Sequence, residues 1–245
     1  MNVPVLITYS NYGYIDFAKN LILNLANVLK HHKLHFYCLD RQTYDELSKT
    51  THEFLTVELF EKDVSSEFEN YKTVKYNKLT HTKTSVLRDA LNKYPFIHFI
   101  DCDVVCLKEP TLQHYSQYSS YDIVFQFDWY FKDNIPIHKF REWQCTGNMS
   151  LRRTPGTLNI IRQLEELQIS DDKNDQECLI SIFTLAKVTD IRKYKSAKLF
   201  VYPPEEYTNG SWKGDTSRIY FFHANHVVGK ADKIALLQSV KQWLL

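Results

Sequence analysis

The sequence predicts an α/β protein with a mostly parallel sheet flanked by helices, and two patterns support this prediction. Short apolar runs of strand length alternate with segments in which apolar residues recur at helical spacing, an order typical of β-α-β units. The apolar runs are continuous, as expected for strands that are buried on both faces. With 245 residues, the chain is long enough for one domain with a sizeable core.

The first part of the chain alternates strands with helices. An apolar strand is interrupted at Asn11, and in the helix that follows, Phe17, Leu21 and Leu25 recur at helical spacing. This order predicts parallel strands with helices on both faces of the sheet. The predicted elements are strand 4–10, helix 16–31, strand 34–40, helix 41–49, strand 54–60, helix 83–94 and strand 96–100.

The second part is less regular but is built from the same kinds of element. Neither an internal repeat nor a linker separates the two parts, so we expect a single domain over residues 1–245. The predicted strands cover residues 121–128, 145–153 and 217–225, and the predicted helices cover residues 155–167, 175–187 and 230–245.

The overall composition argues against several classes of protein. The net charge is +1 and no long basic run occurs, so a nucleic-acid partner is not expected. The chain has only six glycines, with neither the GxGxxG pattern nor the P-loop pattern, which argues against a dinucleotide oxidoreductase and a P-loop NTPase. The five cysteines form no CxxC pair, so neither a zinc ribbon nor a disulfide framework is expected.

The sequence also lacks the patterns of membrane insertion. No stretch approaches the roughly eighteen uninterrupted apolar residues that a membrane span requires. The first residues lack the basic and apolar regions of a signal peptide. We therefore expect no transmembrane segment and a cytoplasmic protein.

Two carboxylates follow the apolar strand at residues 96–100. If the chain stays extended, Asp101 and Asp103 point to the same side, at the edge of a parallel sheet where ligands bind. Carboxylates this close repel each other unless a cation lies near them, and Mn²⁺ or Mg²⁺ prefers such oxygen ligands. A solvated strand end or a helix cap is the alternative interpretation.

A second polar cluster follows the last apolar strand. His223 and His226 come first, and Gly229, Lys230 and Lys233 follow. An imidazole is a suitable third ligand for Mn²⁺, and a lysine ammonium group can neutralise a phosphate. A purely structural histidine is the alternative interpretation.

Two further motifs place polar groups at the ends of predicted elements. Asp175 and Gln176 open a helix, where Asp175 is either a functional carboxylate or the N-terminal cap. In Thr146-Gly147-Asn148 the glycine permits close approach of the backbone, and Asn148 can bond either a ligand or a turn.

The order of these motifs, DxD, TGN, DQ and then HAN with a later glycine and lysine, resembles the GT-A-fold nucleotide-diphospho-sugar glycosyltransferases. The chain looks most like the family that includes plant cell-wall xylosyl- and arabinosyltransferases, and it is more distantly similar to glycogenin and the bacterial α-galactosyltransferases. The resemblance extends from Val5 to about Lys233. It implies a GT-A fold with a nucleotide-binding half at residues 1–105 and a donor-sugar and acceptor half at residues 106–245.

The resemblance also implies an activity. The expected reaction is the Mn²⁺- or Mg²⁺-dependent transfer of a hexose or pentose from a nucleotide-diphosphate sugar, expected to be a UDP-sugar, with retention of anomeric configuration. The expected acceptor is a hydroxyl of a carbohydrate or glycoconjugate. The metal and a lysine neutralise the leaving diphosphate, and a carboxylate or amide stabilises the oxocarbenium character of the sugar. Both a covalent intermediate and attack on the leaving-group face are compatible with retention.

Carried over position by position, the resemblance assigns three sets of residues. The metal ligands would be Asp101, Asp103 and His223, with His226 as the alternative histidine. The catalytic side would contain Asp128, Asp175 and Gln176. Lys233 is the preferred phosphate contact, with Lys230 as its alternative. The residues that bind the donor would be Thr8, Tyr9, Ser10, Asn11, Lys83, Asp101, Asn148, Gly229, Lys230 and Lys233.

The residues also leave two competing functions open. A metal-dependent phosphohydrolase would use clustered carboxylates too, often around two metals. A nucleotide-sugar-binding domain without catalysis would share the motifs that hold the ligand. The tryptophans at Trp129, Trp143 and Trp212 favour a carbohydrate acceptor, because aromatic rings offer stacking surfaces.

Overall fold

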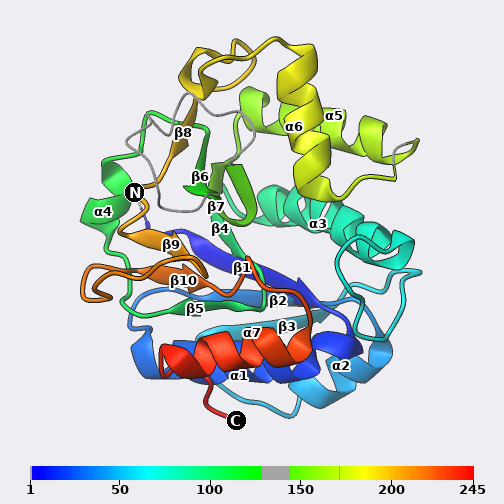
Figure 1. The fold of residues 1–245 in the computed structure, drawn as a ribbon, viewed down its shortest axis with the longest axis vertical. Coiled ribbons are helices and arrows are strands. Elements are labelled where there is room, and N and C mark those ends of the chain that lie inside the picture. The colour runs from blue at the N-terminus through cyan, green and yellow to red at the C-terminus, as the bar shows by residue number, and fades with distance from the viewer. Residues whose placement is uncertain (1, 129–143, 171) are drawn as a thin grey trace.

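The structure, a computed structural model, describes residues 2–128, 144–170 and 172–245. Among these residues, the central sheet contains seven strands. They are β1 (Val5–Ser10), β2 (Leu34–Cys38), β3 (Leu55–Leu59), β4 (Phe96–Ile100), β6 (Ile123–Phe127), β7 (Gln144–Arg152) and β8 (Leu199–Val201). Their order across the sheet is β3-β2-β1-β4-β7-β6-β8 (Figure 1). The first four strands in this order are parallel, and β7 runs antiparallel to both of its neighbours. The carboxyl ends of β1 and β4 therefore lie at the same edge.

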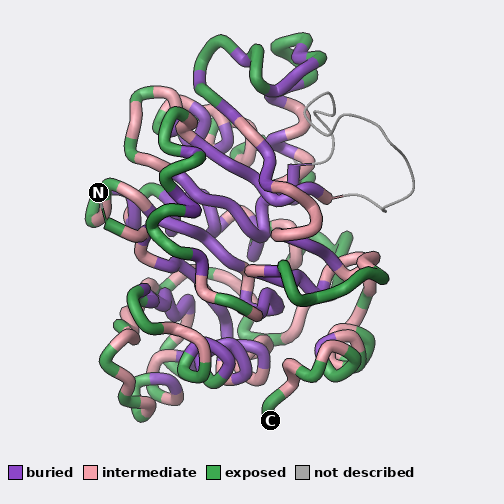
Figure 2. Tube along the Cα trace, turned by 90° about the vertical axis from the view of Figure 1, so that its left-hand side faces the viewer, coloured by how far each residue is buried: buried purple, intermediate pink, exposed green. Residues whose placement is uncertain are grey.

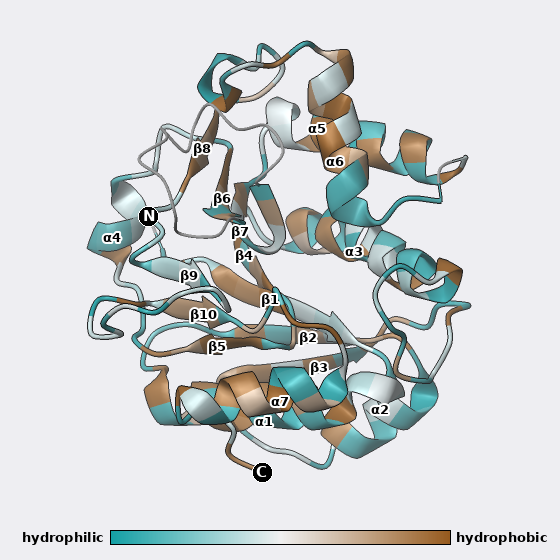
Figure 3. Ribbon diagram, viewed as in Figure 1, coloured by the Kyte–Doolittle hydropathy of each residue, from teal (hydrophilic) through white to brown (hydrophobic). Residues whose placement is uncertain are grey.

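Helices cover both faces of this sheet (Figure 1). One face carries α3 (Val74–Lys93), α5 (Pro155–Gln168) and α6 (Asp175–Leu185), and the other carries α1 (Ile15–Val28) and α7 (Lys230–Ser239). Successive side chains of β1 alternate between these faces: Ile7 joins the apolar cluster under α3, and Leu6 joins the cluster under α1. The strands form the buried, hydrophobic centre between the two helical layers (Figures 2 and 3). Two short helices, α2 (Arg41–Leu47) and α4 (Leu112–Ser116), lie in connections between strands.

A second, smaller sheet connects the C-terminal part of the chain to the central sheet. It contains β5 (Val104–Cys106), β9 (Tyr207–Asn209) and β10 (Phe221–His223), in the order β5-β10-β9. β5 and β10 are antiparallel, with His223 opposite Val104. This pairing brings the late part of the sequence back to the segment that directly follows β4.

The structure confirms the predicted α/β architecture with a mostly parallel, mixed sheet. The helix predicted at residues 83–94 already begins at Val74. The prediction missed its first turns because they are polar and show no apolar stripe. The strand predicted at residues 217–225 is confined to β10, and the last helix ends at Ser239. The short elements β5, β8, β9 and α4 were not predicted, since three to five residues are too few to show a period. Within the described ranges, no helix has both the length and the apolar character that a membrane span requires.

The segment Asp101-Cys102-Asp103 does not continue the strand as predicted. The backbone N–H of Val104 donates to the carbonyl oxygen of Asp101 at 3.0 Å, which closes a turn. This turn carries the chain from the central sheet to the small sheet. The prediction of an extended segment is therefore wrong, although both carboxylates still face one cavity.

Candidate active site

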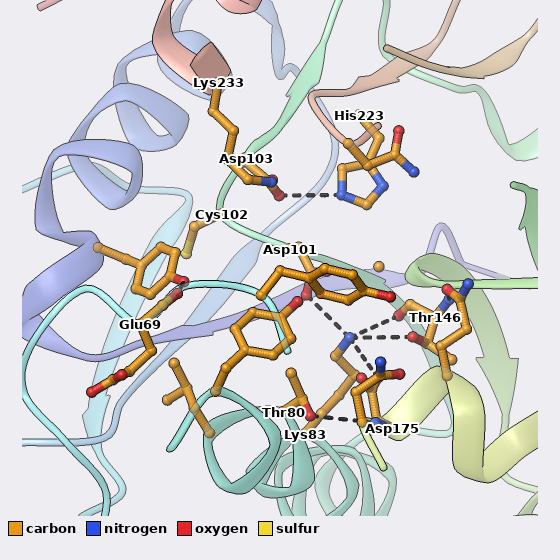
Figure 4. Close-up of a pocket in the computed structure, with 18 of the residues that line it drawn as sticks. Glu69, Thr80, Lys83, Asp101, Cys102, Asp103, Thr146, Asp175, His223 and Lys233 are labelled. Carbon is orange, nitrogen blue, oxygen red and sulfur yellow. Dashed lines mark hydrogen bonds and ion pairs between the residues drawn. The ribbon is translucent and has the colours of Figure 1, made fainter. Parts of the chain in front are cut away.

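A cavity of about 480 Å³ lies at the carboxyl ends of β1 and β4 (Figure 4). Its walls come from these strand ends, from α3, from the start of α6 and from the loop between β10 and α7. Ligands of open α/β proteins bind at such an edge. The acidic, basic and imidazole side chains that line the cavity are Glu69, Lys83, Asp101, Asp103, Asp128, Asp175, Glu177, His223, His226 and Lys233.

Asp101, Asp103 and His223 form a cluster in this cavity. Each offers one ligand atom, and these atoms all lie within 4.8 Å of one another. The pairing of β10 with β5 places His223 beside Asp103, because the backbone N–H of Ala224 donates to the carbonyl oxygen of Asp103 at 3.0 Å. Nε2 of His223 lies 3.2 Å from Oδ1 of Asp103 (Figure 4). Two carboxylates and one imidazole form a donor set that suits Mn²⁺ or Mg²⁺.

The backbone of β7 leaves room for this cluster. The register between β6 and β7 shifts at residues 146–148, which form a bulge with no partner in β6. The bulge brings Gly147 against the cluster, and its carbonyl oxygen accepts the backbone N–H of Asp101 at 2.8 Å. A Cβ at Gly147 would overlap with Oδ2 of Asp101 and Cε1 of His223. The glycine thus preserves the arrangement of the three side chains, whose chemistry fits a divalent metal.

The two carboxylates of the cluster have different electrostatic environments. Burial would raise the pKa of Asp103, but Lys233 and His223 outweigh it and hold this pKa well below its ordinary value. Burial raises the pKa of Asp101, because the opposing charge of Lys83 does not fully offset it. Each carboxylate therefore has its own lysine beside it.

Lys83 of α3 connects the cluster to the start of α6. Its Nζ lies 2.8 Å from Oδ2 of Asp175 and 3.3 Å from Oδ1 of Asp101, and it donates to the carbonyl oxygen of Thr146 at 3.3 Å (Figure 4). Burial would lower the pKa of Lys83, but the two carboxylates raise it well above its ordinary value. The ammonium group therefore stays charged and is held by protein groups on three sides.

Asn174, and not Asp175, caps α6. The side chain of Asn174 accepts the backbone N–H of Glu177 at 2.9 Å, and the carboxylate of Glu177 accepts the backbone N–H of Asn174 at 3.2 Å. The interpretation of Asp175 as the N-terminal cap is therefore wrong. Its carboxylate instead pairs with Lys83 at the cavity wall.

Asp128, directly after β6, joins α6 to the loop between β10 and α7. Nε2 of Gln176 donates to Oδ2 of Asp128 at 2.9 Å, and Nδ2 of Asn225 donates to Oδ1 at 2.7 Å. Nε2 of His226 lies 2.9 Å from the same Oδ1. Burial would raise the pKa of Asp128, but its contacts with His226 and Gln176 lower it. Asp128 is thus an ionised acceptor that holds two walls of the cavity together.

Most of the predicted site residues line this one cavity. Among the described residues, the structure brings His223, and not His226, to the two carboxylates. Thr8 and Asn148 are fully buried outside the lining, and Lys230 pairs with Asp16 at 2.6 Å. The predicted residues that line the cavity are Tyr9, Ser10, Asn11, Lys83, Asp101, Asp103, Asp128, Asp175, Gln176, His223, His226, Gly229 and Lys233.

Part of the cavity wall comes from residues 61–73, which the sequence did not predict to be functional. Asn11 holds this segment, because its Nδ2 donates to the carbonyl oxygens of Ser65 at 2.6 Å and Glu67 at 2.9 Å. The segment has no regular period, so only its place after a parallel strand could have indicated it. Its lining residues are Phe68, Glu69 and Tyr71.

A largely parallel α/β sheet with carboxylates, an imidazole and lysines at its carboxyl edge defines a class of proteins suited to a phosphorylated ligand and a divalent metal. The chain belongs to the nucleotide-diphospho-sugar transferase family, whose sequence model matches residues 29–237. The match includes the cluster of Asp101, Asp103 and His223 as well as Lys233. No curated protein sequence matches the chain.

Solved structures show which fold this is. The chain is similar to the glycosyltransferase GlyE of Streptococcus pneumoniae TIGR4, with a TM-score of 0.60 and 11% identity over 100% of this chain and 61% of that one. It is also similar to the bifunctional glycosyltransferase WbbM, with a TM-score of 0.55 and 11% identity over 96% of this chain and 50% of that one. These similarities show the predicted GT-A fold. The chain spans only 50% to 61% of the length of these proteins.

Proposed function

We propose that the chain is a metal-dependent glycosyltransferase that moves a sugar from a UDP-sugar to a hydroxyl of a carbohydrate or glycoconjugate, with retention of anomeric configuration. Membership of the nucleotide-diphospho-sugar transferase family supports the donor class. The observation that carries the proposal is the cluster of Asp101, Asp103 and His223 with Lys233 beside it in one cavity. A cation bound by this cluster, together with the ammonium group of Lys233, would supply the positive charge that stabilises a departing diphosphate.

The three residues of the cluster and Lys233 would have different roles in binding the diphosphate. Asp101, Asp103 and His223 would hold Mn²⁺ or Mg²⁺, which when bound neutralises the phosphate oxygens of the leaving group. The ammonium group of Lys233 lies beside Asp103 and can share its charge with a phosphate oxygen. Lys233 lines the cavity, whereas Lys230 pairs with Asp16 at 2.6 Å and is not among the lining residues, so we assign the phosphate contact to Lys233.

The donor sugar would lie on the side formed by α6 and the end of β6. Gln176 is oriented there at both ends of its amide, since Nε2 donates to Asp128 at 2.9 Å and Oε1 accepts the backbone N–H of Thr146 at 3.3 Å. The carboxylate of Asp175 is held by Lys83. An ion-paired carboxylate is a weaker nucleophile, so we propose that Asp175 stabilises the oxocarbenium character through its charge and forms no bond with the sugar.

We propose that the acceptor approaches along segment 61–73, which belongs to the predicted nucleotide-binding half and not to residues 106–245, where the resemblance implies the acceptor side. Tyr71 of this segment lines the cavity and is 45% exposed. Its ring packs edge-on against Tyr76, with centroids 5.6 Å apart, and leaves aromatic surface for a sugar ring. Three tryptophans favour a carbohydrate acceptor by sequence. Trp129 and Trp143 lie outside the described residues, and Trp212 is not among the residues that line the cavity.

The experiment that tests the proposal is a donor screen. The purified protein is mixed with each common UDP- and GDP-sugar, with and without Mn²⁺, and nucleotide release and melting temperature are recorded. We expect one UDP-sugar to be slowly hydrolysed and to raise the melting temperature only with metal. The variant Asp103→Asn should remain folded and lose the metal-dependent shift, whereas Asp45→Asn, an exposed carboxylate of α2, should keep it.

Other results would point to the competing functions. Phosphate release from simple phosphoesters, without sugar transfer, would indicate a phosphohydrolase. A metal-dependent shift with a donor but no turnover with any acceptor or water would indicate a binding domain. No response to any donor, with or without metal, would overturn the proposal.

A further inference from the structure

The sulfur of Cys145 contacts the histidine of the proposed metal site at the ring nitrogen that does not face Asp103. Sγ lies 3.4 Å from Nδ1 of His223, while Nε2 of the same ring lies 3.2 Å from Oδ1 of Asp103. Cys145 and His223 are 2% and 5% exposed. The two nitrogens of this buried imidazole therefore have two different protein partners.

Gly147 fixes the ring from a third direction. A Cβ at Gly147 would overlap with Cε1 of His223, the carbon between the two nitrogens. The backbone N–H of Gly147 donates to Sγ of Cys145 at 3.4 Å, so the sulfur itself is held in place. Cys145 and the bulge that follows it thus place a sulfur at one nitrogen of the imidazole and backbone at the adjacent edge.

A histidine offers a lone pair to a metal through one nitrogen when the other nitrogen carries the proton, and a hydrogen-bond acceptor at that proton selects this tautomer. We propose that Cys145 is a positioning residue that does this for His223 when a metal is bound: Nδ1–H would then donate to the sulfur, and the lone pair of Nε2 would be free for the metal on the side of Asp103. This inference rests on the proposed metal site and deepens it.

The geometry also separates this role from that of a metal ligand. The sulfur lies at Nδ1, whereas Oδ1 of Asp103 lies 3.2 Å from Nε2. A metal held by the two carboxylates and Nε2 therefore has oxygen and nitrogen ligands only. Such a donor set favours Mn²⁺ or Mg²⁺ over metals that prefer thiolate.

The test measures binding of Mn²⁺ alone, by electron paramagnetic resonance of the free ion, to the full chain without nucleotide. Loss of the partner of a metal-binding histidine costs about 10- to 100-fold in metal affinity, and we expect this loss for Cys145→Ala. Cys145→Ser retains an acceptor and should restore most of the affinity. The control is Cys38→Ala, which removes an equally buried thiol from β2, outside the cavity lining, and should bind Mn²⁺ as the unchanged protein does.

Each other outcome has a definite meaning. If the unchanged protein binds no Mn²⁺, the metal site and this inference are both overturned. If it binds Mn²⁺ and Cys145→Ala binds equally well, only the inference is overturned. Equal losses in the alanine and serine variants would reduce Cys145 to a packing role. An intense near-ultraviolet thiolate-to-metal band on titration with Co²⁺ would make Cys145 a ligand and also overturn the inference.

Discussion

Nζ of Lys83 lies 2.8 Å from Oδ2 of Asp175, and the two side chains are 5% and 9% exposed. The pair joins α3 to α6 at the wall of the cavity, and the same ammonium group lies 3.3 Å from Asp101. Removing one partner of a buried ion pair leaves an uncompensated charge, which costs more than the pair itself contributes. The pair therefore couples the stability of the fold to the arrangement of the site.

The variant Lys83→Met should lower the free energy of unfolding by about 3–5 kcal/mol, because it leaves the buried carboxylate of Asp175 and the half-buried carboxylate of Asp101 without their cation. Adding Asp175→Asn to this variant should recover part of the loss. The control is Lys93→Met, which removes a half-exposed lysine from the same helix, where Lys93 pairs with Glu58 and Asp89. Exposed pairs contribute about 0–1 kcal/mol. Urea denaturation measures all three, and equal losses for Lys83→Met and Lys93→Met would contradict the prediction.

A methyl group at Gly147 should disturb the proposed metal site while the fold remains. In Gly147→Ala the added Cβ overlaps with Asp101 and His223, so the ligand atoms must move apart and the affinity for Mn²⁺ should fall at least about tenfold. Calorimetric titration with Mn²⁺ measures this, and circular dichroism checks the fold. Met149→Leu, a volume-conserving change on the same strand, should keep its metal affinity. Unchanged binding in Gly147→Ala would show that the cluster does not hold the metal.

The two lysines of α7 should differ in nucleotide binding. With Mn²⁺ present, Lys233→Met should weaken UDP binding by about 10-fold or more, as expected for a lost charge-assisted contact. It should also reduce the dependence of binding on salt. Lys230→Met should have a much smaller effect, because Lys230 pairs with Asp16 outside the cavity. Equilibrium titration with UDP at two salt concentrations measures the affinity of both variants. A larger loss of affinity in Lys230→Met than in Lys233→Met would assign the phosphate contact to Lys230.

Two buried histidines should make stability depend on pH. Burial lowers the pKa of His98 to about 3 and that of His114 to about 4, whereas an unfolded histidine titrates near 6.5. Below about pH 6.5 the unfolded chain binds protons that the folded protein does not, so stability is full above this pH and is lost as the pH falls toward the folded values. From pH 7 to pH 5 we expect His98 alone to account for about 2 kcal/mol.

Urea denaturation at pH 7, 6 and 5 measures this dependence. In the folded protein, Nδ1 of His98 lies 2.8 Å from the hydroxyl of Tyr115, and Nε2 lies 2.7 Å from Oδ1 of Asn148. His98→Asn removes the titrating group and should reduce the slope by about 1 kcal/mol per pH unit, averaged over this range. An unchanged slope in this variant would show that other groups cause the dependence.

Much of the fold and of the cavity could be predicted from the sequence, because the information is local. Continuous apolar runs define β1, β2 and β4, and the polar residues that end them must meet at one edge of a parallel sheet. His223 was preferred to His226 as a ligand because it directly ends a strand, and the structure places it next to Asp103. The backbone of His226 has a φ of 62°, and its ring faces Asp128 instead.

The rest depends on contacts between distant parts of the chain. The turn at Asp101–Asp103 leads into β5, which pairs with the distant β10, and no local pattern marks a three-residue strand. Lys83 was expected to face the nucleotide, but its pairing with Asp175 follows only from the packing of α3 against α6. The role of Cys145 depends on where the bulge of β7 places its sulfur, and one cysteine in a strand carries no sign of this.

The pairing of β5 with β10 has a consequence for synthesis of the protein. It joins residues 104–106 to residues 221–223, so a chain growing on the ribosome carries both aspartates well before the histidine and Lys233 emerge. Closing so long a loop is slow, and a partly made chain cannot assemble the cluster. A cation that binds only the complete cluster would stabilise the docking of the C-terminal segment that contains β10. The resistance of this segment to local unfolding should therefore rise with the cation concentration in the cell.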